Sequence, residues 1–272
     1  MTTDIGTERR GYRRMVVNRL AVLEGTAQRG TGGVAMAVLV ILWELFCRTG
    51  LVSSLYLPSP WAIVNAGMEM VGSGELLNNT LASLYRIGLG FLSGSIIGIV
   101  AGLALGFSRL AAAVGNPVIY ALYPIPKIAL LPLIILWLGI GELSKVAIIS
   151  LGVFFPVFIN TYSGVKNVDP LLIRVAVSFK ASRLNLIRKV ILPGALPVIF
   201  AGLKLAAGTS LLLLVAAEMI AAKEGVGAMI LHYGDLMLTT KLMVGVVTLS
   251  LLGVAFNQGL QWLENRLIRW KH

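Results

Sequence analysis

The stretch VDPLLIRVAVSFKASRLNLIRKVILPGALP, residues 168–197, separates two long apolar runs and decides how the chain is organised. It carries five basic side chains and a single acidic one, Asp169. Short apolar groups alternate with polar residues at helical spacing until Leu192 and Pro193. A loop that only joined two membrane spans would need a few polar residues. We therefore expect this segment to fold as a helical hairpin that another protein grips.

The composition indicates a membrane protein. Of the 272 residues, 57% are hydrophobic and 13% are charged, and the mean hydropathy is +0.86. Soluble domains are usually about 25% charged. Within lipid, only helices and closed barrels satisfy every backbone polar group. The apolar runs are continuous over about 20 residues, as in membrane helices, rather than alternating over about 10, as in barrel strands. The expected fold is an all-α polytopic membrane protein.

Six spans can be assigned along the chain, at residues 31–46, 87–107, 111–138, 146–162, 196–222 and 242–263. The third of these is too long to cross a membrane simply. It contains Pro124, Pro126 and Pro132, and a proline inside a helix removes one hydrogen bond and clashes with the preceding turn. We therefore expect a kink near Pro124 and Pro126.

The placement of Lys and Arg predicts the orientation, because cytoplasmic loops carry an excess of them. Basic residues gather in segment 1–30, after the second span, in the hairpin at 167–193 and in the tail at 266–272. The six-span domain at 31–265 then has both termini in the cytoplasm, and the chain lies in the inner membrane. Segment 1–30 has one apolar face and can lie on the lipid surface as an interfacial helix.

The same placement argues against several other classes. The net charge of +11 is tied to the ends of the spans, so nucleic-acid binding is disfavoured. The single Cys47 excludes a disulfide framework and a CxxC metal site within the chain. The two histidines, His232 and His272, are isolated, so we expect no metal site.

The hairpin resembles the coupling loop of importer permeases of the ATP-binding cassette (ABC) class. Their pattern is Glu-Ala-Ala, three residues, Gly, nine residues, Ile, one residue, Leu-Pro. With Leu192 and Pro193 on the final pair, Ala176 matches the second alanine. Arg174 stands at the Glu position and inverts its charge, and Lys180 stands at the Gly position. Glycine usually supplies a backbone shape there that lysine adopts less easily.

Three further segments resemble permeases for nitrate, sulfonates and taurine: residues 57–60 (LPSP), 124–142, and 215–220 followed by 224–227. The resemblance implies a homodimer of six-span subunits, two cytoplasmic ATPases and an external solute-binding protein. It also implies alternating access for a small anionic solute. The chain contains no P-loop, so ATP and Mg²⁺ are expected on the partner subunits. We expect neither catalysis nor a bound cofactor in this chain.

The resemblance predicts which residues meet the ATPase. Small side chains would allow close approach, and a cap at Asn167 or Asp169 would begin the first helix of the hairpin, with Pro170 in its first turn. The expected docking residues are Arg174, Ala176, Lys180, Ala181, Ser182, Leu192 and Pro193.

Charges within spans are costly and tend to be functional. Lys127 follows the proline break, and we assign it to the solute pathway together with Pro124, Pro126 and Glu218. The alternatives for Lys127 are pairing with Glu218 or snorkelling. Glu218 would either brace a helix break before the following glycines or line the outer gate.

Three other features have plainer interpretations. Glu44 has Arg48 four residues away as a partner, and Lys204 can snorkel to the cytoplasmic face. Glycines recur in the second span mostly every four residues, which favours tight helix packing: Gly88, Gly90, Gly94, Gly98, Gly102 and Gly106.

Alternative functions stay open at this point. One is an ABC permease for another solute, such as an aromatic acid, an osmolyte or a pyrimidine. A secondary transporter would often show an internal repeat, which is not evident. A membrane enzyme would need clustered His, Asp or Glu near one interface, and none is visible in the sequence.

Overall fold

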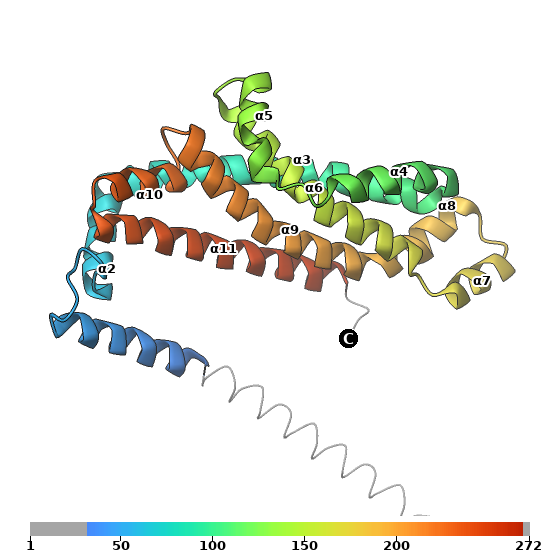
Figure 1. Cartoon of the computed structure of the whole chain (residues 1–272). Helices are drawn as coiled ribbons and strands as arrows, with labels where there is room; N and C mark the ends of the chain where they lie inside the picture. The colour runs from blue at the N-terminus through green and yellow to red at the C-terminus, as the bar shows by residue number, and fades with distance from the viewer. Residues whose placement is uncertain (1–31, 269–272) are drawn as a thin grey trace, which may run out of the picture. The chain divides into compact units, whose positions relative to one another are not determined.

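A computed structural model describes residues 32–268 (Figure 1). The chain divides into two compact units, Met1–Val64 and Asn65–His272. In the first unit, a helix over residues 32–48 coincides with the predicted first span. The interfacial helix expected at 1–30, and most of the tail expected at 266–272, lie outside the described residues.

Every regular element from residue 60 to residue 268 is a helix, as expected. In chain order they are α2 (Pro60–Gly72), α3 (Glu75–Phe107), α4 (Arg109–Leu122), η1 (Lys127–Leu130), α5 (Leu131–Leu138), α6 (Glu142–Lys166), α7 (Pro170–Ser178), α8 (Arg183–Leu186), η2 (Ile187–Ile191), α9 (Leu192–Ala221), α10 (Val226–Asp235) and α11 (Thr239–Leu267).

Among the described residues, four helical stretches are long and apolar enough to cross a membrane: α3, α6, the run Arg183–Ala221, and α11. α4 and the segment formed by η1 and α5 meet at an angle of 88°, and together they have the length and apolar character of a fifth, broken span or of a re-entrant loop. This break confirms the kink predicted near Pro124 and Pro126. The break has a physical cause, since two prolines in three residues remove two amide donors from the helical ladder.

Glycines bring α3 and α6 into close contact. A Cβ atom added to Gly90 would lie 2.6 Å from Ile149 Cγ2, and one added to Gly98 would lie 2.9 Å from the carbonyl oxygen of Phe154. Eight residues further along, a Cβ on Gly106 would lie 2.8 Å from Val165 Cγ1. This stripe of small residues lets the two backbones approach, as the glycine spacing predicts.

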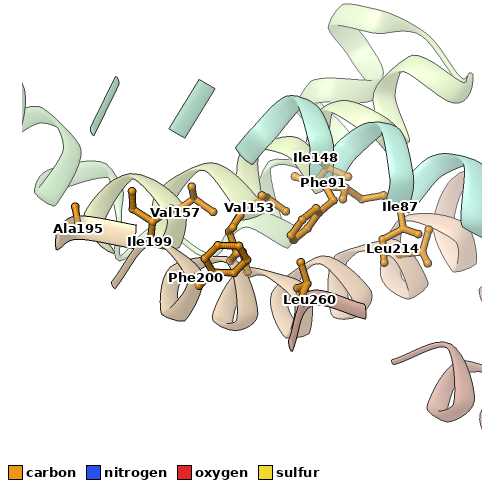
Figure 2. Packing of buried hydrophobic residues seen from close by; sticks show 14 of the residues in the cluster. Ile87, Phe91, Ile148, Val153, Val157, Ala195, Ile199, Phe200, Leu214 and Leu260 are labelled. Carbon is orange, nitrogen blue, oxygen red and sulfur yellow. The ribbon is translucent and has the colours of Figure 1, made fainter. Parts of the chain in front are cut away.

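The core of the second unit lies between α3, α6 and α9 (Figure 2). Ile87 and Phe91 of α3 point toward α6 and α9, where Val153 and Leu214 are fully buried. Phe91 also meets Phe256 of α11 edge-on, with ring centroids 4.7 Å apart. α3, α6 and α9 therefore form a packed scaffold, and α7 and α10 lie at its two ends (Figure 1).

Candidate functional site

The hairpin folds as two short helices joined by a tight turn. Its first helix, α7, begins at Pro170, whose fixed φ suits a first helical position. The side chain of Asp169 caps this helix by accepting a hydrogen bond from the Leu171 amide at 2.7 Å. Of the two predicted caps, Asp169 is therefore the one in use. Ser182 caps α8 in the same way, accepting from the amide of Asn185 at 3.4 Å.

The turn after α7 explains the glycine of the family pattern. Lys180 has a φ of +52°, in the left-handed region that a residue with a Cβ atom seldom occupies. Its amide donates to the carbonyl of Val177 at 2.9 Å, and the Ala181 amide donates to the carbonyl of Ala176 at 3.1 Å. These two bonds are the Schellman arrangement that ends many helices, usually with glycine at the left-handed position. The chain adopts this backbone despite having lysine there.

The hairpin presents an apolar face to its surroundings. No residue of α7 is buried, and Phe179 is 83% exposed. Of the predicted docking residues, Arg174, Lys180 and Ser182 are exposed, and Ala176 and Ala181 are half-buried. The exposed large apolar side chains here are Leu171, Leu172, Val175, Val177, Phe179 and Leu184. An exposed apolar patch of this kind marks an interaction surface.

The hairpin is joined to α9 without a break. α8, the π-helical turn η2 and α9 form one helical run from Arg183 to Ala221. Leu192 and Pro193 lie at the start of α9, where both are half-buried, and Leu192 packs against the core. These two predicted docking residues therefore belong to the root of the hairpin, and the exposed face lies on α7.

A cavity of about 530 Å³ opens beside the broken span. Its walls come from α6 and α9, at the middle of both helices, and from the residues around the break. The lining residues are Tyr123, Lys127, Ile128, Gly152, Phe155, Pro156, Leu205, Thr209, Leu212, Leu213 and Ala216. Pro124 and Pro126 shape the break and are exposed, but neither is among the lining residues.

Lys127 directs its ammonium group at this cavity wall. Nζ lies 4.3 Å from the ring centroid of Phe155 and 5.1 Å from that of Tyr123. It donates to the carbonyl of Tyr123, and a second carbonyl, that of Leu122, lies 3.5 Å away. The ammonium group thus compensates carbonyls freed at the end of α4. Within residues 32–268 it forms no ion pair with a carboxylate, so the alternative of pairing with Glu218 is wrong.

Glu218 lies elsewhere, completely buried near the end of α9. Its carboxylate pairs with Nη1 of Arg86 at 2.8 Å and accepts from the hydroxyl of Ser83 at 2.7 Å. It also accepts from the Gly227 amide at 2.8 Å, beyond the break that separates α9 from α10. Of the two alternatives for Glu218, these contacts fit the brace. The carboxylate is not among the groups that line the cavity.

Arg86 connects this brace to α6. Its Nε and Nη2 donate to the two carboxylate oxygens of Glu142 at 2.6 and 2.8 Å, a bidentate pair. Glu142 also pairs with Lys145 at 3.1 Å. We call Ser83, Arg86, Glu142, Lys145 and Glu218 the Arg86 cluster. It lies at the opposite end of α6 and α9 from the hairpin.

The Arg86 cluster requires a glycine at position 225, in the break between α9 and α10. Gly225 has a φ of +128°, and a Cβ atom there would strike the carboxyl group of Glu218. Its amide donates to Oδ1 of Asn79 at 2.7 Å. The span assigned from the sequence begins at residue 87, which leaves Arg86 outside it, so the cluster was not predicted. The available signal was an arginine one residue before a long uncharged run.

The other two charges within spans are also paired. Glu44 pairs with Arg48 at 2.8 Å, as expected from their spacing, and accepts from the Trp61 amide at 3.1 Å. Lys204 does not simply snorkel, because it forms an ion pair with Glu264 of α11. In the part of the chain from residue 32 to residue 268, no three His, Cys, Asp or Glu side chains are grouped as a metal site would need.

Comparison with known proteins identifies relatives that are transport permeases. Residues 94–269 match the family described as the inner membrane component of binding-protein-dependent transport systems. The putative aliphatic sulfonates transport permease of Bacillus subtilis is 38% identical over 236 residues, covering 87% of this chain and 86% of the relative. The taurine transport system permease of Escherichia coli is 37% identical over 240 residues, covering 86% and 87%.

Solved structures agree at the level of the fold. A chain of the MetNI methionine ABC transporter, in an inward-facing conformation, superposes with a TM-score of 0.57 at 20% identity, covering 70% of this chain and 93% of that one. A chain of an amino acid ABC transporter solved with histidines gives a TM-score of 0.56 at 18% identity, covering 73% and 97%.

Proposed function

Because the chain belongs to the family of inner-membrane permeases of binding-protein-dependent ABC transport systems, we propose that it carries a small organic anion into the cell. In this proposal two copies of the chain form the pathway across the cytoplasmic membrane, with both termini and the hairpin in the cytoplasm. Two separate ATPase subunits bind ATP and Mg²⁺, and an external solute-binding protein delivers the solute. The chain itself needs no cofactor and performs no catalysis.

The observation that carries this proposal is the exposed apolar face of α7. A surface helix normally buries such a face, and this one is left uncovered at the tip of a capped, well-defined hairpin. The face includes Leu171, Val175 and Phe179, and basic side chains surround it. It suits a groove on a partner protein that has apolar walls and an acidic rim.

The connection to α9 gives the hairpin a mechanical role. The run Arg183–Ala221 reaches from the hairpin, past the cavity, to Glu218. When the ATPases close on ATP, a displacement of α7 would tilt this run as one body. The Arg86 cluster would hold its far end as a pivot, so the cavity wall in between would move together with the hairpin, by a smaller amount. Movement of that wall is what alternating access requires.

The solute class follows from charge and from the relatives. The two bacterial relatives are named as permeases for aliphatic sulfonates and for taurine, both of which carry a sulfonate group. Lys127 supplies a positive charge that has no carboxylate partner within residues 32–268, beside a cavity lined by residues from the middle of α6. A charge in such a low-dielectric place interacts more strongly with an anion than it would in water.

The proposal is tested by reconstituting the chain with its ATPase in proteoliposomes and adding the loaded solute-binding protein outside. We expect solute to accumulate only when ATP is enclosed and the binding protein is present. Accumulation driven by an ion gradient without ATP would indicate a secondary transporter instead. Replacement of Cys47 and labelling of Ser182→Cys in whole cells tests the orientation, since an impermeant reagent added outside should not react.

A further inference from the structure

The cavity beside the broken span has a chemistry more specific than a general anion pathway. We propose that it is a solute site within each subunit for small alkyl monoanions, and that it disfavours zwitterions such as taurine. The site would take a sulfonate or carboxylate head at Lys127 and a short aliphatic chain against α9. This inference rests on the proposed function only in that the solute must pass the cavity.

The anionic head is assigned by Lys127. Of the four charges within the spans assigned from the sequence, Glu44, Lys204 and Glu218 all have ionised partners, and only Lys127 has none within residues 32–268. Its ammonium has three protons, and backbone carbonyls at the end of α4 take up at most two of them. The remaining proton and the uncompensated charge can bind an oxyanion.

The aliphatic chain is assigned by the wall opposite the break. Leu205, Leu212, Leu213 and Ala216 of α9 line that wall, and Thr209 is the only polar side chain among the residues of α9 that do so. The hydroxyl of Thr209 already donates to the carbonyl of Ala206 at 3.0 Å. A bare inorganic oxyanion would leave this wall unused, whereas a short alkyl chain would bury apolar surface against it.

The exclusion of a zwitterion follows from the missing acid. None of the lining residues is Asp or Glu. The ammonium group of taurine would therefore lose its water without gaining a carboxylate, and it would also lie in the field of Lys127. Desolvating a charge without a partner is strongly unfavourable. Ethanesulfonate has the same skeleton without the ammonium group, so the two compounds form a matched pair.

A phospholipid is the competing occupant. Gly152 and Pro156 lie at the middle of α6, and Thr209 lies near the middle of α9. A phosphate headgroup at either membrane surface would lie at the ends of these helices, about 15 Å or more from the centre of the bilayer. The position of Lys127 thus favours a free solute over a lipid headgroup.

Direct binding to the permease–ATPase complex in nanodiscs, without the solute-binding protein, tests the site. We expect ethanesulfonate to bind at least tenfold more tightly than taurine. Affinity should rise up to about fourfold for each added methylene from ethane- to butanesulfonate. Lys127→Met should weaken ethanesulfonate binding tenfold or more, and the control Lys223→Met, at an exposed lysine, should leave it unchanged. Leu213→Ala should flatten the dependence on chain length.

Several results would overturn the site. They are taurine binding as tightly as ethanesulfonate, displacement of ethanesulfonate by equimolar sulfate, and unchanged binding by Lys127→Met. Loss of ethanesulfonate binding when phosphatidylglycerol replaces phosphatidylcholine in the nanodiscs would assign the cavity to lipid. Receptor-dependent uptake is measured on the same preparations. Uptake by the parent without Lys127-dependent binding refutes only the site, whereas absence of ATP-dependent uptake refutes the proposed function.

Discussion

At the scale of single residues, two positions depart from the family pattern and they do so differently. Lys180 keeps the left-handed backbone that the pattern's glycine provides, so the fold of the turn is conserved while the side chain is not. Arg174 changes the charge on the exposed face of α7 and leaves the backbone unaffected. The sequence alone identified both departures. It could not show that lysine tolerates the turn, because that depends on the two capping hydrogen bonds of the Schellman arrangement.

Lys180→Gly should stabilise the hairpin. Relief of the left-handed strain gains about 1–2 kcal/mol, and the greater freedom of glycine in the unfolded chain costs about 0.5–1 kcal/mol. We expect slower hydrogen exchange of the Ala181 amide and undiminished recovery of the ATPase complex. Lys180→Val, which is β-branched, should do the opposite. If the glycine variant loses the ATPase as completely as the valine variant, the ammonium group matters and the backbone does not.

Arg174→Glu restores the family residue but should weaken coupling in this chain. We infer that the cognate ATPase presents an acidic or carbonyl-rich surface to Arg174. A charge left unpaired at a buried interface costs about 2 kcal/mol or more, which corresponds to at least tenfold in affinity. Stimulated ATPase activity and complex recovery are measured for Arg174→Glu and Arg174→Ala. Parent-like behaviour of both variants would mean that shape alone holds the interface.

At the scale of the elements, the sequence predicted the structural features that are determined by neighbouring residues in the chain. The hairpin, its Asp169 cap and the break at Pro124 and Pro126 all follow from residues close in the chain. The bonds from Arg86 to Glu142 and Glu218, and the pair between Lys204 and Glu264, join residues at least 56 positions apart. Such pairs depend on which helices become neighbours, and span assignment does not supply that information.

Glu218→Ala should destabilise the permease by about 3 kcal/mol, because it leaves Arg86 buried with one of its two carboxylates removed. The double variant Arg86→Met with Glu218→Met should be less damaging than this single change. Thermal unfolding of the purified complex is the measurement. Glu224→Ala serves as the control, since Arg86 contacts only the backbone carbonyl of that exposed residue. Equal effects at 218 and 224 would mean that the brace contributes little.

The packing of α3 on α6 gives a sharper comparison. A Cβ atom at Gly94 would strike the backbone carbonyl of Ser150 and lie 2.8 Å from Val153 Cβ, so neither helix can easily yield. Gly94→Ala should cost about 1–3 kcal/mol of stability. A Cβ atom added at Gly88 would have no neighbouring atom within 4 Å. Gly88→Ala should therefore be neutral or slightly stabilising, because alanine favours the helix. Similar thermal shifts in the two variants would contradict the close packing.

At the scale of the whole molecule, the run Arg183–Ala221 links the three functional features of the second unit. The hairpin lies at one end of it, the cavity wall at its middle and the Arg86 cluster at the other end. The sequence motifs indicated the transporter class through their resemblance to ABC permeases, and the family match confirmed it. The cavity could not be predicted, since its walls come from three segments of the chain that meet only in the folded protein.

The most direct test of this account is ATP-dependent, receptor-dependent uptake by the Phe179→Ser variant in proteoliposomes. Phe179 is the most exposed apolar side chain of the hairpin and contributes nothing to the buried core. The control is Tyr56→Ser, which removes an aromatic ring that is 78% exposed elsewhere. We predict that Phe179→Ser unfolds at the parent temperature but loses its ATPase and its uptake, while the control keeps both. Parent-level uptake and ATPase recovery by Phe179→Ser would contradict the claim that α7 couples ATP hydrolysis to transport.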